Sequence, residues 1–440
     1  MATPVKSTQS DIAASIPDAW FKSELLKPGD FTMLYRRFAK KEKLPPGSGK
    51  TWKANRMIRI EMPMDALSEG VTPGEVGITM EQVSCTAAEY GIVMTMTNVA
   101  LLTIDTPLLQ QGVQAIKDSM NRLDEELICE ALLAGTNVMY ADASGGASIP
   151  AARSDLAAAD VFGTETIKRV VNQLSYPSDV KWGAAPKFGN GYYVAILPRK
   201  FEFDLLGDST WKDMAIRQKR EDLESGMINR WLGVEFYVTD WGPKFTNLGT
   251  TDNNTAPTAT TAGVVPQEAS LLGTFLANTA YDFKWTRRHK HRRFEEGISG
   301  VIAHAATAND GVNTKTFKLY APTDTAYVYN FYQGANTGTL YRVATNVAAS
   351  SITEILTPMT AGTAAPVHTA TGVTAYAAFV FGRDAYAVVD LDSLSAGVTP
   401  DARTGEDPLK QRRKISASFF EGALILADSN LVRVEASSAF

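Results

Sequence analysis

The chain has 440 residues, 45% of them hydrophobic, and a formal net charge of -5. Such a chain can bury a large core. Its net negative charge argues against a protein whose main function is to bind nucleic acid. Two cysteines, Cys85 and Cys129, are too few for a disulfide framework and indicate a reducing compartment during folding. The N-terminus lacks a charged-then-apolar leader, and no apolar run is long enough to cross a bilayer, so we expect a soluble intracellular protein.

The first segment of the chain is predicted to be an arm. Pro4, Pro17 and Pro28 interrupt its first 30 residues and prevent a long helix. A short helix is expected in the stretch "FTMLYRRFAKKEKL" that follows.

The stretch "LPPGSGKTWKA", residues 44–54, matches the second half of a phosphate-binding loop. Gly49, Lys50 and Thr51 fit the pattern G-x-x-x-x-G-K-[ST], but Leu44 stands where the first glycine belongs. The two prolines after Leu44 have no N–H to offer a phosphate, and a strand-like pattern follows where a phosphate loop needs a helix. We interpret Gly-Ser-Gly as a flexible hinge entering a strand. A nucleotide hydrolase built around Lys50 is kept as an alternative.

An extended β-hairpin is predicted over residues 50–104. In "TWKANRMIRIEMPM", Trp52 and Arg56 belong to one set of alternating positions, and period two indicates a strand. The Gly- and Pro-containing residues 65–78 then lead to a second extended run, residues 79–102. Neither strand has the apolar residues for a core of its own, so the hairpin needs another surface to lie on.

The clearest element is a long helix over residues 107–134. Thr106 can cap it, Pro107 can begin it and Gly135 can end it. At 1.5 Å per residue it is about 40 Å long, which suits the backbone of a flat domain, and a coiled-coil seam is the alternative. A single apolar stripe supports the helix, formed by Leu109, Val113, Ile116, Met120, Leu123, Leu127 and Ala131.

Strands and helices alternate in the next part of the chain, which indicates an α/β or α+β arrangement. A helix capped by Thr164 is expected in "TETIKRVVNQL". A buried strand followed by a helix is expected in "GNGYYVAILPRKFEFDLL", and a turn with another buried strand in "SGMINRWLGVEFYVTD".

Residues 299–372 differ in composition from the rest of the chain. Charged residues almost vanish there, and the short runs "TKTFKLYAP", "AYVYNFYQ", "TLYRVAT" and "SITEILT" are separated by turn signals. This pattern predicts a small all-β module inserted in the chain. Strand-like segments return afterwards in "YAAFVFGRDAYAVVDL" and "ALILADSNLVRVEA".

The densest charge run is "KWTRRHKHRRFEEG", residues 284–297. One interpretation is contact with a phosphate backbone, aided by base stacking on Trp285. The other is a solvated strand, or one that meets an acidic surface of a neighbouring subunit. An extended run would put basic side chains on both faces, whereas a nucleic-acid groove concentrates charge on one side. With the acidic overall charge, this favours subunit contact.

No group of residues indicates catalysis or metal binding. His289 and His291 are spaced like ligands, but basic neighbours disfavour a cation and neither cysteine lies near in sequence. The stretch "GASIP" around Ser148 ends in Pro150 instead of the glycine of a nucleophile elbow. The carboxylates of Asp124–Glu126 are expected to be solvated on the polar face of the long helix. We predict no enzyme activity, no catalytic residue, no cofactor and no metal.

The order of these parts resembles the major capsid protein of tailed double-stranded DNA phages. The stretches "PPGSGKTWKANR", "LSEGVTP", "YGIVMTMTN", "LLAGTNVMYA", "VFGRDAYAVV" and "DPLKQRRKISASFFEGALIL" look like the capsid family typified by podophages that carry an RNA polymerase in the virion. The resemblance covers about residues 30–300 and 373–436. It implies an α+β tailed-phage major-capsid fold with an inserted small all-β domain.

The resemblance also implies a division of the chain. The implied parts are the N-terminal arm (1–49), the extended loop hairpin (50–104), the peripheral domain with its spine helix (105–184), the axial domain and return strand (185–298), the inserted β domain (299–372) and the C-terminal strands that complete the core (373–440). Some shells of this fold are locked by Lys–Asn isopeptide bonds. Residues 65–80 contain no lysine, so we expect no such cross-link there.

The implied function is structural. The chain is expected to self-assemble into hexamers and pentamers of an icosahedral capsid around double-stranded DNA, in a virion assembled in the host cytoplasm. Expected partners are other copies of the chain, portal and scaffolding proteins, a decoration protein on the insert, packaged DNA through weak contact only, and no membrane. An encapsulin-type cargo shell is the alternative of the same fold. The predicted subunit-interface residues are Trp52, Arg56, Glu69, Arg287, Arg288, Arg292 and Arg293.

Overall fold

The computed structural model describes residues 33–45, 47, 49–60, 75–97, 108–143, 148–176, 183–212, 230–247, 264–267, 274–276, 279–290, 292–298, 303–306, 316–322, 324–335, 338–365, 372–399 and 412–439. Most of the predicted arm (residues 1–32) and the tip of the predicted hairpin (residues 61–74) lie outside the described residues.

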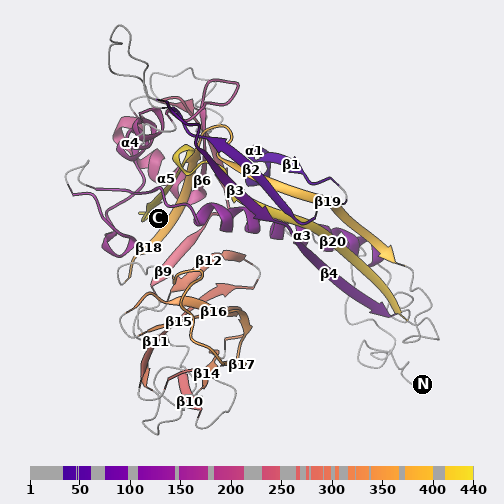
Figure 1. The fold of residues 1–440 in the computed structure, drawn as a ribbon. Helices are drawn as coiled ribbons and strands as arrows, with labels where there is room; N and C mark the ends of the chain where they lie inside the picture. Colours follow the sequence, from indigo (N-terminus) through magenta and orange to yellow (C-terminus); the bar gives the residue numbers. More distant parts are fainter. Residues whose placement is uncertain are drawn as a thin grey trace, which may run out of the picture. The chain divides into compact units, whose positions relative to one another are not determined.

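Both helices and strands are present, with strands in the majority, as expected for an α+β chain (Figure 1). The helices are α1 (Tyr35–Phe38), α3 (Leu108–Leu133), α4 (Thr164–Ser175) and α5 (Arg199–Gly207), with short 3-10 turns η1 (Arg153–Asp155) and η2 (Asp428–Asn430). The strands up to β10 are β1 (Lys40–Lys43), β2 (Thr51–Met57), β3 (Met80–Thr86), β4 (Ala88–Thr97), β5 (Val138–Tyr140), β6 (Tyr193–Pro198), β7 (Arg230–Trp231), β8 (Val234–Thr239), β9 (Lys244–Asn247) and β10 (Val264–Gln267). The later strands are β11 (Ala280–His289), β12 (Arg292–Ile298), β13 (Ala303–Ala306), β14 (Thr316–Tyr320), β15 (Tyr327–Ala335), β16 (Tyr341–Ala348), β17 (Ile352–Ile355), β18 (Thr374–Phe381), β19 (Tyr386–Thr399), β20 (Arg412–Ile425) and β21 (Leu431–Ala436).

The described residues fall into two compact units. The smaller unit contains residues 89–123 and 392–420, and the larger unit contains residues 33–88, 124–391 and 421–440. Helix α3 and strands β19 and β20 each have residues in both units.

In the smaller unit, β20 is paired between β19 and β4. A Cβ atom at Gly91 of β4 would lie 3.4 Å from the carbonyl oxygen of Ala417, so the glycine permits a close approach to β20. The rings of Tyr90 and Phe419 lie 5.6 Å apart on these two strands. These contacts give β4 a firm attachment to its neighbour.

The larger unit is organised around a sheet with the strand order β16-β15-β11-β12-β9-β18-β6-β8-β7. Strand β6 is buried along its whole length, so side chains on both of its faces are covered. On one face, Ala195 and Leu197 pack with α4, α5 and β21. On the other face, Val194 and Ile196 pack with α1 and with residues 128–132 of α3. This sheet with helices on both faces is the centre of the unit.

The predicted all-β region contains only strands among its described residues. Each of the four apolar runs singled out in the sequence forms one strand, in the order β14, β15, β16 and β17. Strand β11 pairs with β13 and with β15, so strands from both sides of residue 298 share one sheet. The division of the chain at residue 298 therefore stays a prediction. Aromatic side chains form the core here, including Phe275, Phe283, Phe317 and Tyr329.

The predicted hairpin is confirmed as the antiparallel pair of β2 and β3. The alternation also holds, since Trp52, Ala54 and Arg56 are half-buried while their neighbours are exposed. The second extended run, however, is two strands instead of one. It breaks at the buried Ala87, after which β4 joins a different sheet. A change of strand-pairing partner at one residue cannot be recognised from a pattern of alternating side chains.

The long helix is confirmed as α3, but its buried face was only partly predicted. Ile116 and Met120 of the predicted stripe are buried. In the last three turns the buried apolar side chains are instead Ile128, Cys129 and Leu132. The stripe changes side because α3 there packs against the central sheet and α1.

The carboxylates of this helix correct the sequence prediction. Asp124 and Glu125, expected to be solvated, are 7% and 2% exposed. They are buried because α1 lies against them and supplies hydrogen-bond donors. Gly135, predicted to end the long helix, lies two residues after the last residue of α3, Leu133. A Cβ there would meet Asp428 Oδ1 at 3.0 Å, so the glycine allows close approach of the η2 turn.

Two further details differ from the sequence prediction. The charge run over residues 284–297 is not one extended strand, because β11 and β12 pair antiparallel and the chain turns back between His289 and Arg292. Thr164 is the first residue of α4 instead of its cap. Its backbone N–H and its hydroxyl both donate to Asp208 Oδ2, at 2.9 and 2.8 Å, so a distant carboxylate takes over the capping.

Candidate functional site

The predicted interface residues of the hairpin base contact their own chain. Trp52 packs against the apolar cluster of Leu44, Ala87 and Val389. Arg56 donates from Nη1 to the carbonyl oxygen of Leu426 at 3.0 Å. This face of β2 therefore holds the hairpin on the larger unit, and the opposite face is the one left to solvent.

Of the other predicted interface residues, the four arginines lie far from the hairpin in sequence. Glu69 lies outside the described residues. The guanidinium of Arg287 lies 4.4 Å from the ring centre of Tyr327. Arg288 Nη1 lies 3.5 Å from Glu130 Oε1, and Arg342 Nη1 lies 3.6 Å from the same oxygen. Glu130 of α3 thus binds two arginines, one from β11 and one from β16.

Arg292 and Arg293 are the first two residues of β12. The structure thus places the basic residues of the charge run on two paired strands instead of one. Whether any of the seven residues meets a neighbouring subunit stays a prediction.

An exposed apolar patch on the hairpin was not singled out in the sequence. It consists of Met57, Val76, Ile78 and Met80, and we call it the hairpin patch. Met57 and Met80 are direct cross-strand partners, and the four side chains are 58% to 62% exposed. Large apolar side chains grouped at such exposure mark an interaction surface. The sequence signal was the apolar side chains of Val76, Ile78 and Met80 at every second position leading into β3.

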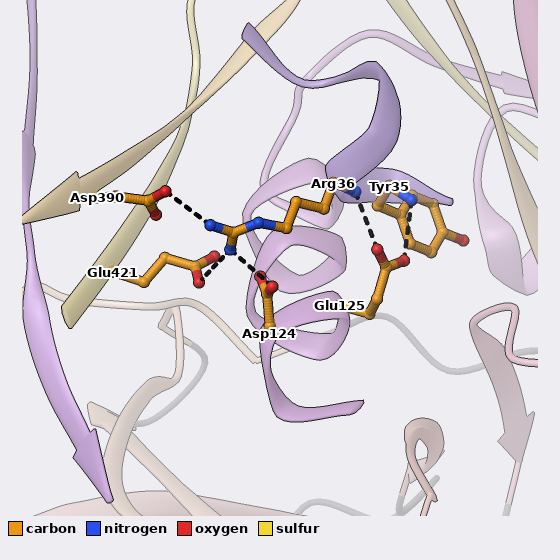
Figure 2. Close-up of polar contacts among 6 residues, drawn as sticks. All are labelled: Tyr35, Arg36, Asp124, Glu125, Asp390 and Glu421. Atoms are coloured by element: carbon orange, nitrogen blue, oxygen red, sulfur yellow. Dashed lines mark hydrogen bonds and ion pairs between the residues drawn. The ribbon is translucent and has the colours of Figure 1, made fainter. Parts of the chain in front are cut away.

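A partly buried cluster of charged side chains surrounds Arg36, as Figure 2 shows. Arg36 Nη1 donates to Asp124 Oδ2 at 2.6 Å and to Glu421 Oε2 at 2.9 Å, and its Nη2 donates to Asp390 Oδ2 at 2.7 Å. One guanidinium from α1 thereby joins α3, β19 and β20. Burial alone would lower the pKa of Arg36, but the three carboxylates together raise it above its ordinary value.

Glu125 fixes the start of α1 beside this cluster. Its Oε2 accepts the backbone N–H of Tyr35 and its Oε1 accepts that of Arg36, both at 2.9 Å. Burial raises the pKa of Glu125 to about 7, and the two amide hydrogen bonds oppose that rise. Such a carboxylate satisfies the free N–H groups of a helix start in the manner of a cap.

The cluster could not be found from the sequence. Arg36 and its acidic partners are separated by 88, 354 and 385 residues, and no local pattern links them. The only signal was the charge of the residues themselves, and of these only Asp124 was assigned a place, among the carboxylates expected to be solvated on the long helix.

The phosphate-loop alternative finds little support in the geometry around Lys50. Gly47 and Gly49 adopt positive φ angles of 84° and 86°, and Lys50 is exposed. The chain then continues directly into β2, a strand. A phosphate loop uses backbone N–H groups at the start of a helix, and no helix begins here.

The described residues contain neither a metal-binding cluster nor a membrane-spanning helix. No group of three or more His, Cys, Asp and Glu side chains is placed there to hold a metal ion. None of the described helices combines the length and apolar character required to cross a membrane.

Solved structures of phage capsids share the fold of this chain. A chain of the cyanophage Pam1 capsid asymmetric unit matches with a TM-score of 0.55 and 11% identity, over 100% of both chains. The head structure of Helicobacter pylori bacteriophage KHP40 matches with a TM-score of 0.55 and 8% identity, over 99% of both chains. The capsid of Ralstonia phage GP4 matches with a TM-score of 0.51 and 11% identity, over 98% of both chains.

No protein-family model matches the chain, and no curated protein matches it. The structural matches confirm the predicted fold class, an α+β chain with the tailed-phage major-capsid fold. The first of these matches extends over the full length of both chains.

Proposed function

We propose that this chain is the major capsid subunit of a tailed phage and self-assembles into the hexamers and pentamers of an icosahedral shell. The observation that carries the proposal is the full-length match to phage capsid chains, with TM-scores of 0.51 to 0.55. A fold by itself hosts many functions. The surface of this chain adds independent support.

The hairpin patch supports assembly with other copies. Met57 and Met80 are paired on the outward face of a two-stranded ribbon, and both side chains are exposed there. Burying the patch against a neighbouring copy would remove apolar area from water, and contacts repeated around a closed ring add up. The contact would be heterologous, since a hairpin meets a different surface on the next subunit.

The six predicted parts of the chain receive roles in this proposal. The arm and the hairpin reach neighbouring subunits, α3 is the spine of the peripheral domain, and residues 185–298 form the axial domain at the ring centres. The insert of residues 299–372 lies on the outer face and is the place for a decoration protein. The seven predicted interface residues are proposed to contribute at the edges of these contacts. The particular likeness to podophages with a virion RNA polymerase belongs to the proposal as well.

The net negative charge of the chain is consistent with a capsid shell around packed DNA. A net charge of -5 limits adhesion to phosphate, so DNA contact is weak and local, and filling is left to a separate motor with portal and scaffolding proteins. Strong DNA binding by dissociated subunits at physiological salt would contradict this part of the proposal.

Electron microscopy of the full-length protein, expressed with and without a co-expressed scaffold, tests the proposal. We expect rings, tubes or closed shells with repeating six- and five-fold units. A species that stays monomeric at high concentration under both conditions would refute self-assembly.

Two further measurements separate the alternatives. Particles that hold protein cargo and no nucleic acid when isolated from a natural source would indicate an encapsulin-type shell. A nucleotide-binding assay on the wild type and on Lys50→Ala addresses the hydrolase, and we expect no binding to either. Saturable ATP binding that Lys50→Ala abolishes would favour the enzyme.

A further inference from the structure

The carboxylates around Arg36 exceed the positive charge available to them. Three carboxylates, Asp124, Asp390 and Glu421, contact one guanidinium. If all were ionised, the cluster would carry two uncompensated negative charges in a place where the Glu421 side chain is 1% exposed and that of Asp124 10% exposed. Uncompensated buried charge is costly, so a carboxylate in this position usually takes up a proton.

The geometry indicates which pair of carboxylates holds the proton. Asp124 Oδ2 and Glu421 Oε2 both accept from the same nitrogen, Nη1 of Arg36, at 2.6 and 2.9 Å. Two carboxylates held so close cannot both remain charged at low cost. Asp390 differs, because it has Nη2 to itself and its side chain is more exposed, at 16%.

The unused oxygens of this pair point to the same conclusion. Asp124 Oδ1 and Glu421 Oε1 are both buried and both without a hydrogen-bond donor. Two acceptors side by side cannot satisfy each other, but a proton on one of them makes it a donor to the other. Burial and the adjacent Asp124 together raise the pKa of Glu421 to about 9, against the lowering effect of Arg36.

Other titratable or charged side chains, on α3, β3 and β1, are consistent with one proton on the Asp124–Glu421 pair. Besides Arg36, α3 contributes Glu125, which binds the amides of α1. Strand β3 contributes Cys85, whose pKa is raised by burial and by Glu421. Strand β1 contributes Lys43, in register with Asp390 and exposed, so it does not neutralise the Asp124–Glu421 pair.

We propose that Asp124 and Glu421 share one proton at neutral pH, which makes the contact between α3 and β20 a pH-sensitive junction. The O–H of Glu421 donates to Asp124, and Arg36 binds the remaining oxygen of each. Separating β20 from α3 at this point exposes Glu421 to water and releases the proton. Alkaline conditions therefore favour separation. This inference does not depend on the proposed function, because it concerns a contact within one chain.

Infrared difference spectroscopy on the dissociated full-length protein tests the proton directly. At pH 8, above the pKa of about 7 of Glu125, the wild type is expected to show a protonated-carboxyl C=O band that is missing from Glu421→Gln and that titrates with a midpoint near pH 9. Asp124→Asn should lose the band as well, because its amide donates to Glu421 and leaves that carboxylate ionised. Asp390→Asn is the matched control within the cluster and should keep the band.

A second measurement follows the coupling to unfolding. Glu421 binds its proton in the folded chain and loses it in the unfolded chain between its ordinary pKa of 4.5 and about 9. Its contribution to stability is thus complete below pH 4.5 and is lost as pH rises through that window. The unfolding constant of the wild type should rise about tenfold per pH unit relative to Glu421→Gln between pH 6 and 8. Parallel pH profiles together with no carboxyl band in the wild type would overturn the proposal.

Discussion

Arg153 and Glu435 form a buried two-point ion pair. Arg153 Nε donates to Glu435 Oε2 and Nη2 donates to Oε1, both at 2.7 Å, and the two side chains are 8% and 0% exposed. The guanidinium also stacks on Phe245, at 3.6 Å from the ring centre. The pair joins η1 to the C-terminal strand β21, two segments 282 residues apart in the chain.

Replacing Glu435 by alanine should lower the free energy of unfolding by about 3–5 kcal/mol. The substitution leaves Arg153 buried without its counter-charge, and that is the costly way to break such a pair. Urea unfolding followed by tryptophan fluorescence measures the change. The matched control is Asp240→Ala, which breaks the exposed pair of Arg199 and Asp240 and should cost about 1 kcal/mol or less. Equal shifts for the two variants would show that burial of the first pair has no energetic consequence.

Tyr386→Phe should loosen α1. The hydroxyl of Tyr386 donates to the backbone carbonyl oxygen of Tyr35 at 2.6 Å, in the buried cluster beneath this helix. Loss of one buried hydrogen bond costs about 1 kcal/mol. We expect faster trypsin cleavage after Arg36 and Arg37 in the variant. Tyr176→Phe changes the same group at a side chain that is 82% exposed and should leave the cleavage rate as in the wild type.

Charges on the hairpin patch should block assembly without unfolding the subunit. In the double variant Met57→Lys and Met80→Lys, two ammonium groups would have to be desolvated in any contact that covers the patch. Sedimentation velocity should show subunits in place of assemblies, with an unchanged far-UV circular dichroism spectrum. Ile352→Lys alters an equally exposed apolar residue of β17 and should assemble normally. Normal shells from the double variant would exclude the patch as a contact.

Asp208 should stabilise α4 in a pH-dependent way. Burial on its own would raise the pKa of Asp208, but hydrogen bonds from Thr164, Thr210 and Trp211 outweigh it and lower the pKa below its ordinary value of 3.8. The contribution is therefore complete above pH 3.8 and is lost as pH falls through the lowered pKa. Asp208→Ala should cost about 1–2 kcal/mol at pH 7, by thermal unfolding, and much less at strongly acid pH. A cost independent of pH would contradict the role of the ionised carboxylate.

The sequence predicted the elements whose pattern depends only on backbone geometry. Alternation marked β2 because successive side chains of a strand point to opposite faces. Spacings of three and four marked α3 because a helix repeats every 3.6 residues. The order of these elements, together with short sequence motifs, was enough to indicate the fold that the structural matches confirm.

The sequence did not reveal which strands pair with one another. The break at Ala87, where the chain leaves β3 for a second sheet as β4, lies in the stretch Met80–Tyr90, which contains no Gly or Pro as a turn signal. The charge run of residues 284–297 shows no turn signal at the point where β11 turns back into β12. Both features depend on which strand lies alongside, and this is a property of the assembled sheet.

Sequence thus determined the kind and order of the elements, and tertiary structure decided which charges are buried. Asp124 and Glu125 have the composition of a solvated helix face, and they are covered only because α1 and β20 arrive from 88 and more residues away. The physical reason is that periodicity is set by neighbours along the chain. Burial, hydrogen bonding and proton uptake are set by neighbours in space.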